Sequence, residues 1–268
     1  MNRFTRVFQR LERDGGCGLF PYLMAGFPDV ATSHALAEAA LQAGSDGFEI
    51  GVPFSDPLAD GATLQRVNAA ALEHGAGLDT ALDLVRAIRR RAPATPVAVM
   101  SYYNPLRQRG DERVAQDLAA AEADAVIVPD LPAEESADLR VALRSHALGL
   151  VPLLAPTSHT ARIRAVAALD PVFVYCVALV GVTGARQDLS NTLGPFLARV
   201  RAESSAPLVV GFGISQPAHV REAARLGAAG AIVASALIDV VEHADDPVLA
   251  AAAYLREMKQ GGVGASAR

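Results

Sequence analysis

Short apolar runs alternate with longer stretches of helical pattern along nearly the whole chain. About eight runs are rich in apolar or β-branched residues, at 18–24, 47–51, 97–101, 125–128, 150–154, 172–176, 208–213 and 230–234. Helical periodicity fills the gaps, for example at 33–43, 79–91, 111–123, 134–146, 191–204, 216–226 and 247–259. Strands that alternate with helices indicate a parallel sheet.

This repeating unit predicts one α/β domain, a (β/α)8 TIM barrel, over residues 1–268. The length of 268 residues fits the roughly 250 that such a barrel uses. No linker or block of charge divides the chain, so we expect no second domain. A tail rich in Gly, Ser and Ala at about 260–268 is predicted to be disordered.

The first residues form an amphipathic pattern of their own. Arginines alternate with an apolar stripe of helical period, made of Phe4, Val7, Phe8 and Leu11. We expect an extra N-terminal helix that covers the floor of the barrel. An organelle presequence is the alternative, and Glu12 and Asp14 weigh against it.

Composition narrows the possible functions. Hydrophobic residues make up 51% of the chain, aromatic residues 5%, and the net charge is -5. The net negative charge argues against nucleic-acid binding, which relies on clustered positive charge. The arginines at 89–91 are interpreted as the solvated end of a helix. No apolar run approaches the ~20 residues of a membrane span, so we expect a soluble, cytoplasmic protein, with Cys17 and Cys176 as reduced core thiols.

Glycines gather at the ends of the later runs. Segment 181–184 (GVTG) follows the sixth run, 211–213 (GFG) ends the seventh, and Ala234 and Ser235 lie at the start of a helix after the eighth. A single glycine pair is more often a helix stop or a close packing contact. Together, in a barrel, these segments converge where backbone N–H groups and a helix N-terminus bind phosphate.

Two acids, one within the second run and one in the loop that follows it, are the candidate catalytic groups. Glu49 lies between apolar neighbours on a predicted strand, where a charge is unfavourable without a partner or a function. It is either a salt-bridged structural glutamate or a carboxyl group whose pKa burial raises for proton transfer near neutral pH. Asp60 ends the loop that leaves the same strand and either makes a turn or reaches the same cavity.

The remaining residues exclude several mechanisms. The sole lysine, Lys259, lies beyond the last run, so no lysine is placed to form an imine with a substrate. The six histidines are scattered, which argues against a metal site. The sequence has no Gly-x-Gly-x-x-Gly turn after a strand, which argues against a binding site for a nicotinamide or flavin dinucleotide. Acid–base chemistry by carboxylates on a phosphorylated substrate remains. Breaking a carbon–carbon bond in that way requires a leaving group that accepts a proton on carbon.

At this point a family resemblance is clear over about residues 3–258. Segments 48–61 (FEIGVPFSDPLADG), 180–184 (VGVTG) and 211–215 (GFGIS) resemble the signatures of the tryptophan synthase alpha subunit. The resemblance implies a lyase of tryptophan biosynthesis that cleaves indole-3-glycerol phosphate to indole and D-glyceraldehyde 3-phosphate by a retro-aldol reaction.

The resemblance also implies roles for the candidate residues. Glu49 would serve as acid and base at C3 of the indole and at the glycerol hydroxyl, and Asp60 would accept the indole N–H. The implied substrate-binding residues divide into a pocket for indole and a site for phosphate. They are Tyr22, Leu64, Met100, Tyr175, Thr183, Gly184, Phe212, Gly213, Ala234 and Ser235.

Thr183 would in addition hydrogen-bond Asp60 when the loop that carries Thr183 closes.

The sequence departs from the family at three positions. Ala234 stands where glycine is usual, so its methyl group is expected to crowd the anion. Ala178 and Leu179 replace residues that are more often polar, which bears on the loop and not on the reaction.

The resemblance further implies an alpha2beta2 heterotetramer. The beta subunit would carry pyridoxal phosphate, and this chain would need no cofactor and no metal. Loop 53–56 and the Asn104-Pro105 segment would face the partner. The alternatives are a stand-alone lyase that releases free indole, a non-catalytic docking subunit, and a sugar-phosphate epimerase or isomerase.

Overall fold

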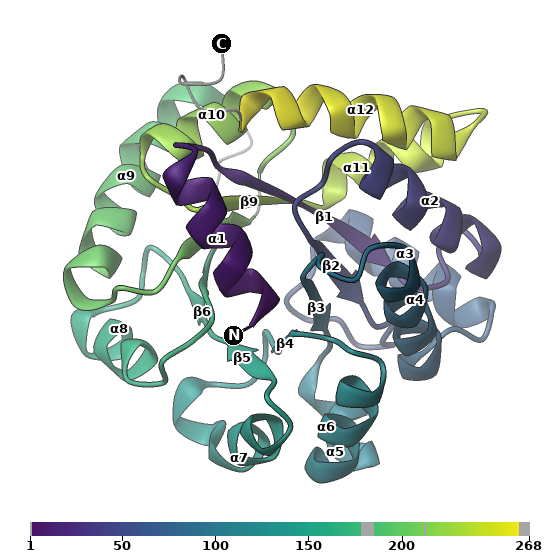
Figure 1. Cartoon of the computed structure of the whole chain (residues 1–268), viewed down its shortest axis with the longest axis horizontal. Coiled ribbons are helices and arrows are strands. Elements are labelled where there is room, and N and C mark those ends of the chain that lie inside the picture. The colour runs from purple at the N-terminus through teal and green to yellow at the C-terminus, as the bar shows by residue number, and fades with distance from the viewer. Residues whose placement is uncertain (1, 178–184, 212, 263–268) are drawn as a thin grey trace.

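Nine parallel strands form the wall of a barrel, and helices surround it (Figure 1). The computed structural model describes residues 2–177, 185–211 and 213–262. Neighbouring strands pair in the order β5-β4-β3-β2-β1-β9-β8-β7-β6. The strands are β1 (Gly18–Met24), β2 (Phe48–Gly51), β3 (Val97–Met100), β4 (Ala125–Ile127), β5 (Gly149–Val151), β6 (Leu153–Leu154), β7 (Val174–Val177), β8 (Leu208–Gly211) and β9 (Gly230–Val233).

The ninth strand arises because Pro152 divides the fifth predicted run. Proline has no N–H to donate to a ladder, and the run splits into β5, which pairs with β4, and β6, which pairs with β7. The Pro152 carbonyl still accepts the Tyr175 N–H at 3.0 Å. The two ends of the strand order are therefore joined through one residue, and the prediction of a (β/α)8 barrel is confirmed.

Helices follow the strands and lie outside the sheet. They are α1 (Arg3–Arg13), α2 (Val30–Gln42), α3 (Ala62–Glu73), α4 (Leu78–Arg91), α5 (Tyr103–Arg109), α6 (Asp111–Ala120), the 3-10 turn η1 (Ala133–Glu135), α7 (Ala137–Ser145), α8 (Thr160–Ala167), α9 (Ala185–Glu203), α10 (Pro217–Arg225), α11 (Ser235–His243) and α12 (Pro247–Gly261).

Some predicted helix bounds were wrong. Helix α9 begins six residues earlier than predicted, and α7 begins only after the separate turn η1. Helix α12 continues to Gly261, two residues beyond its predicted end and into the start of the predicted tail. Residues 263–268, where most of that tail falls, lie outside the described residues.

Helix α1 lies across the floor of the barrel, as its amphipathic pattern predicted (Figure 1). Phe4 and Phe8 contact Phe20 of β1 and Phe173 beside β7, with ring centroids 5.1 to 5.9 Å apart. Such tilted and edge-on contacts are favourable for aromatic rings. This aromatic cluster closes the barrel at the amino ends of its strands.

Two aspartates hold α1 against the sheet, and each precedes an even-numbered strand. Asp46, before β2, accepts the Leu19 N–H and pairs with Arg10 of α1 at 2.6 Å. Its other ion-pair partner is the sole lysine, Lys259. Asp124 repeats the arrangement before β4.

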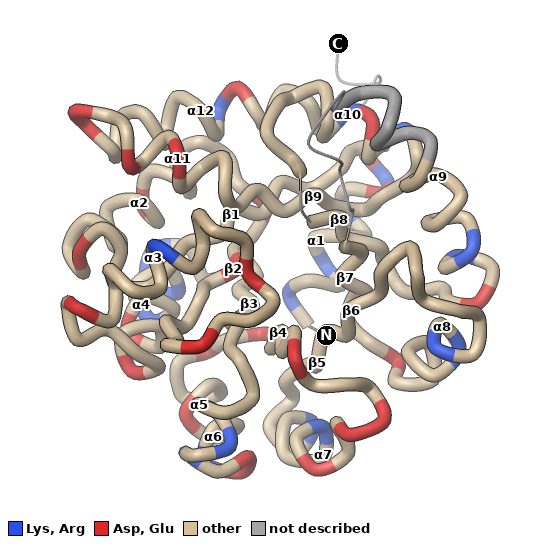
Figure 2. Tube along the Cα trace, turned by 180° about the vertical axis from the view of Figure 1, so that it is seen from behind, with Lys and Arg blue, Asp and Glu red and all other residues tan. Residues whose placement is uncertain are grey.

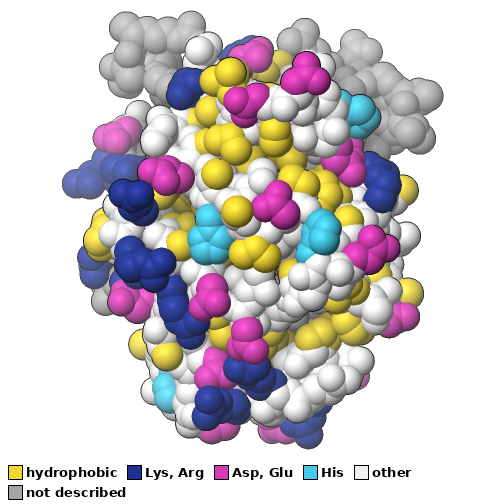
Figure 3. All heavy atoms as spheres, turned by 90° about the vertical axis from the view of Figure 1, so that its right-hand side faces the viewer, with side chains coloured by type: hydrophobic (Ala, Val, Ile, Leu, Met, Phe, Trp, Pro, Cys, Tyr) yellow, Lys and Arg dark blue, Asp and Glu magenta, His cyan; other side chains and the backbone are white. Residues whose placement is uncertain are grey.

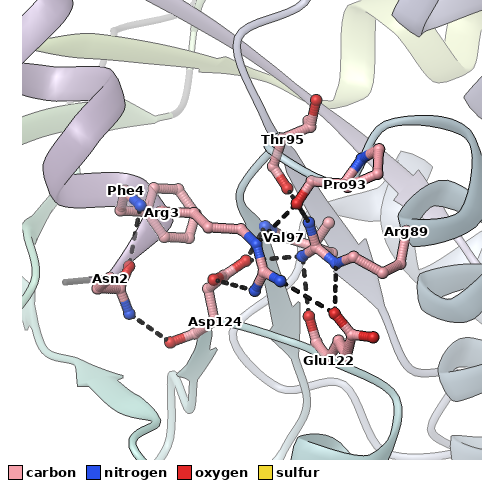
Figure 4. Close-up of polar contacts among 9 residues, drawn as sticks. All are labelled: Asn2, Arg3, Phe4, Arg89, Pro93, Thr95, Val97, Glu122 and Asp124. Carbon is pink, nitrogen blue, oxygen red and sulfur yellow. Dashed lines mark hydrogen bonds and ion pairs between the residues drawn. The ribbon is translucent and has the colours of Figure 1, made fainter.

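Asp124 is the centre of a larger polar cluster (Figure 4). Its carboxylate accepts the Val97 N–H at 2.9 Å and pairs with both Arg3 and Arg89 at 3.0 Å. Arg89 also donates to the carbonyl oxygens of Pro93, Thr95 and Glu122. The prediction that Arg89 is solvated was wrong, because this arginine is 5% exposed and joins α4 to the floor.

Charge is distributed over the outside of the barrel. In Figure 2, basic residues lie mainly on the outer helices, while acidic segments also lie beside β2 and β4 near the barrel axis. In Figure 3, basic and acidic side chains are interspersed on the face of α2, α3 and α4. Both cysteines are free and buried, as expected. No helix of the described part of the chain is long and apolar enough to span a membrane.

We expect the Asp124→Asn variant to be less stable than the wild type by about 3 kcal/mol, because the buried Arg89 guanidinium loses its buried charge partner and keeps only the exposed Glu122 at 3.7 Å. The matched control is Glu122→Gln, since Glu122 pairs with the same two arginines but its side chain is 57% exposed. Glu122→Gln is expected to lower the free energy of unfolding by less than about 1 kcal/mol. Urea denaturation measures both, and equal losses would contradict the assignment of Asp124 as the anchor.

Candidate active site

A cavity of about 730 Å³ opens at the carboxyl ends of the strands. All the predicted site residues that the structure describes line this one cavity. They are Tyr22, Glu49, Asp60, Leu64, Met100, Tyr175, Gly213, Ala234 and Ser235. The other predicted residues, Thr183, Gly184 and Phe212, lie outside the described residues, as do Ala178 and Leu179.

Glu49 lies in the middle of β2, in register with Tyr22 of β1 and Ala98 of β3. The residue is only 2% exposed, and its Oε2 is buried without a hydrogen-bond partner. Burial raises the pKa of this carboxyl to about 8, with a smaller contribution from the nearby Asp60 charge. No ion pair among the described residues includes Glu49, so the salt-bridged interpretation finds no support.

Asp60 approaches the cavity from the loop that leaves β2. Its carboxylate Oδ2 accepts a hydrogen bond from Asn68 Nδ2 at 3.1 Å, and the residue is 8% exposed. Burial raises the pKa of Asp60 to about 6, while hydrogen bonds from Tyr102 and Asn68 oppose the rise. At neutral pH the cavity therefore holds a protonated Glu49 and an ionised Asp60.

Two tyrosines lie in the wall, each against a glycine of the next strand. A Cβ at Gly51 would lie 2.1 Å from the Tyr22 hydroxyl oxygen, and a Cβ at Gly211 would lie 2.1 Å from that of Tyr175. Only glycine leaves room for these rings. Burial raises the pKa of both phenols, so both remain protonated.

The apolar part of the cavity is larger than the sequence predicted. Beside Leu64 and Met100, it includes Ile127 of β4, Leu153 of β6 and Ile232 of β9. Ile127 is in register with Met100 on the neighbouring strand. Four polar lining residues were also not predicted as site residues: Ser158, Arg162, Ser215 and Asp239.

The predicted phosphate end lies between the carboxyl ends of β8 and β9. Gly213 has a φ of 73°, which an L side chain adopts only with strain. Ser235 begins α11, and Ala234 precedes it as the N-cap residue with a negative φ of -121°. The backbone N–H groups at the start of α11 have no partner within the helix and suit an anion.

The fold and this cavity define a (β/α)8-barrel enzyme with two buried carboxyl groups at the carboxyl ends of the strands. A family model described as tryptophan synthase alpha chain matches residues 8–263. The chain belongs to the tryptophan synthase alpha chain family.

Relatives and solved structures agree with this assignment. The tryptophan synthase alpha chain of Roseiflexus sp. (strain RS-1) is 52% identical over 91% of this chain and 93% of its own length. That of Chloroflexus aurantiacus is 48% identical over 96% and 97%. The crystal structure of the alpha subunit from Legionella pneumophila str. Paris has a TM-score of 0.90 at 33% identity, with 97% and 98% of the two chains covered.

We predict that Glu49→Gln becomes more stable than the wild type as pH rises. The pKa of Glu49 is raised in the folded state, so wild-type stability falls between pH about 4.5, where the carboxyl of the unfolded chain loses its proton, and pH about 8, where the buried carboxyl loses its own. Glutamine does not titrate. The difference should grow to several kcal/mol, at about 1.4 kcal/mol per pKa unit.

Urea midpoints for both proteins at several pH values between about 5 and 8.5 measure this difference. Asp60 titrates in both proteins, so the comparison isolates Glu49 together with its coupling to the Asp60 charge. A difference that stays constant with pH would show that Glu49 is solvated.

Proposed function

We propose that this chain cleaves indole-3-glycerol phosphate to indole and D-glyceraldehyde 3-phosphate. The observation that carries the proposal is the Glu49 carboxyl group, buried without a partner in the wall of the cavity and with a pKa raised to about 8. The cavity volume lies within the range of roughly 300–1,000 Å³ that is usual for small-molecule sites. Family membership supports the same reaction.

In the proposed reaction, Glu49 first donates its proton to C3 of the indole. The ring becomes an indolenine, and the positive charge that develops at N1 is stabilised by the ionised Asp60, which accepts the N1–H. The Glu49 carboxylate then removes the proton of the adjacent glycerol hydroxyl. The carbon–carbon bond breaks, the aldehyde forms, and the bonding electrons restore the indole ring, so that Glu49 ends protonated.

The remaining lining residues would contact different parts of the substrate. The apolar residues Tyr22, Leu64 and Met100 would contact the indole ring, with Ile127 and Ile232 beside them. Gly213, Ala234 and Ser235 would hold the phosphate, together with Gly184 and Phe212. Tyr175 would contact the glycerol chain, and Thr183 would reach Asp60.

The proposed chemistry requires no cofactor in this chain. Lys259 lies outside the lining of the cavity and pairs with Asp46 near the floor, so it is not placed to form an imine. We place pyridoxal phosphate on the beta partner only. A cytoplasmic location accords with a biosynthetic enzyme.

We further propose that the chain works in an alpha2beta2 complex. Tryptophan synthase from Mycobacterium tuberculosis contains a chain similar to this one, with a TM-score of 0.89 and 34% identity over 98% of both chains. Loop 53–56 and the Asn104-Pro105 segment would face the beta subunit. The neighbouring Leu58 is 91% exposed, an apolar side chain that a partner would cover.

Glu49→Gln is predicted to lower the rate of indole formation at least about 10³-fold, since the loss removes both proton transfers. Asp60→Asn should lower it by roughly 10²-fold or more because the charge at N1 is no longer stabilised. Steady-state assays with indole-3-glycerol phosphate measure this, with Glu122→Gln as the control of unchanged rate. Binding of glycerol phosphate should survive in both variants.

The same assay with added beta subunit separates the alternatives. A dependent alpha subunit is slow alone and accelerates with its partner, whereas a stand-alone lyase does not respond. Full function in Glu49→Gln would instead favour a docking subunit. An epimerase or isomerase would convert a sugar phosphate and form no indole.

The pH dependence of kcat/KM is expected to be bell-shaped. Activity requires ionised Asp60 and protonated Glu49, so the rate should fall below pH about 6 and above pH about 8. Rates measured across this range at constant ionic strength test the assignment. A profile that keeps rising above pH 8 would contradict a protonated Glu49.

A further inference from the structure

We propose that Asn68 is the positioning residue of Asp60, through one side-chain amide that holds both the carboxylate and the loop that carries it. The proposal rests on the function proposed above, because it assigns the geometry of the group that accepts the indole N–H. Asn68 lies in α3, the helix that follows this loop. It was not predicted from the sequence.

The Asn68 amide is buried and forms three hydrogen bonds. Nδ2 donates to Asp60 Oδ2 at 3.1 Å and to the Leu64 carbonyl oxygen at 2.8 Å, while Oδ1 accepts the Phe54 N–H at 2.9 Å. The residue is 2% exposed. Only one orientation of the amide satisfies all three contacts, because the NH2 group cannot accept and the oxygen cannot donate.

The bond to Leu64 fixes the side chain on its own helix. Leu64 precedes Asn68 by one turn, and both face the barrel together with the buried Val67 and Ala71. The amide is thus held by a packed helix instead of by the loop. A donor with a fixed direction limits the rotation of the carboxylate that it binds.

Residues near both ends of the loop contact Asn68 or Tyr102. Phe54 near the start of the loop donates to Asn68, and its ring lies 5.4 Å from that of Tyr102. Near the end of the loop, the Ala59 N–H donates to the Tyr102 hydroxyl at 2.9 Å. The same Asn68 amide therefore holds the backbone at Phe54 and orients the Asp60 carboxylate.

The decisive variant is Asn68→Asp in the full-length chain. An aspartate at this position can still accept the Phe54 N–H but can no longer donate to Asp60 or Leu64. Gln65→Glu is the matched control, because Gln65 donates only to the Asp60 backbone carbonyl, at 2.9 Å, and the change adds the same charge on the same helix. Asn68→Leu removes all three hydrogen bonds.

Carbon-13 NMR of the Asp60 carboxyl group gives a readout independent of activity. In Asn68→Asp, the Asp60 titration should move upward by about one pH unit, well beyond the shift in Gln65→Glu. In Asn68→Leu it should also move upward, since the donor is lost without any added charge. Equal shifts in Asn68→Asp and Gln65→Glu, or no shift in Asn68→Leu, would overturn the proposal.

Kinetics of indole formation give the second readout. Asn68→Asp should lower kcat by roughly 10²-fold, change KM for indole-3-glycerol phosphate little, and move the acidic limb of the pH profile upward. A loss in Asn68→Leu alone would assign Asn68 to holding Phe54 and contradict the positioning of Asp60. If the wild type forms no indole, the proposed function fails, while the titrations still decide the role of Asn68.

Discussion

The burial of one carboxyl group is the constraint on which the proposed chemistry of this barrel depends. Glu49 lies on a central strand whose other side chains are apolar, and no described group offers a hydrogen bond to its Oε2. Desolvation disfavours the charged form, so the proton stays on the group at neutral pH. Asp60 lies nearer the rim, where two donors favour its ionised form. The contrast between the two acids follows from their surroundings and not from their residue types.

The two ends of the barrel divide stability from function. At the floor, aromatic rings and two aspartates hold α1 against the sheet, and both aspartates are paired with arginines. At the other end, a carboxyl group whose Oε2 has no hydrogen-bond partner and a glycine of positive φ line a large cavity. This division is common in TIM barrels, where the carboxyl ends of the strands carry the active site.

Much of the fold followed from local patterns in the sequence. The eight strand positions and the amphipathic α1 depend on periodicity within a few residues, and the structure confirms them. The catalytic roles of Glu49 and Asp60 stay predictions, although the structure does place both acids in one cavity. Arg89 was misjudged because its partner Asp124 is distant in sequence and an arginine triplet resembles a helix end.

Asn68 and Ile127 were missed for different physical reasons. An asparagine within a helix carries no local sign that it hydrogen-bonds a preceding loop. The strands of a parallel barrel are buried on both faces, so alternation does not distinguish a side chain that faces the cavity from one that faces a helix. Register with Met100 places Ile127 in the cavity, and register is a property of the folded sheet.

The contacts between Tyr22 and Gly51 and between Tyr175 and Gly211 have an evolutionary consequence. Each ring occupies the space that a side chain on the next strand would need. A larger residue at either glycine becomes acceptable only once the tyrosine opposite has become smaller. Descendants of this sequence should therefore change these positions in pairs, and a single replacement at one of them should persist only when its counterpart across the strand has already changed.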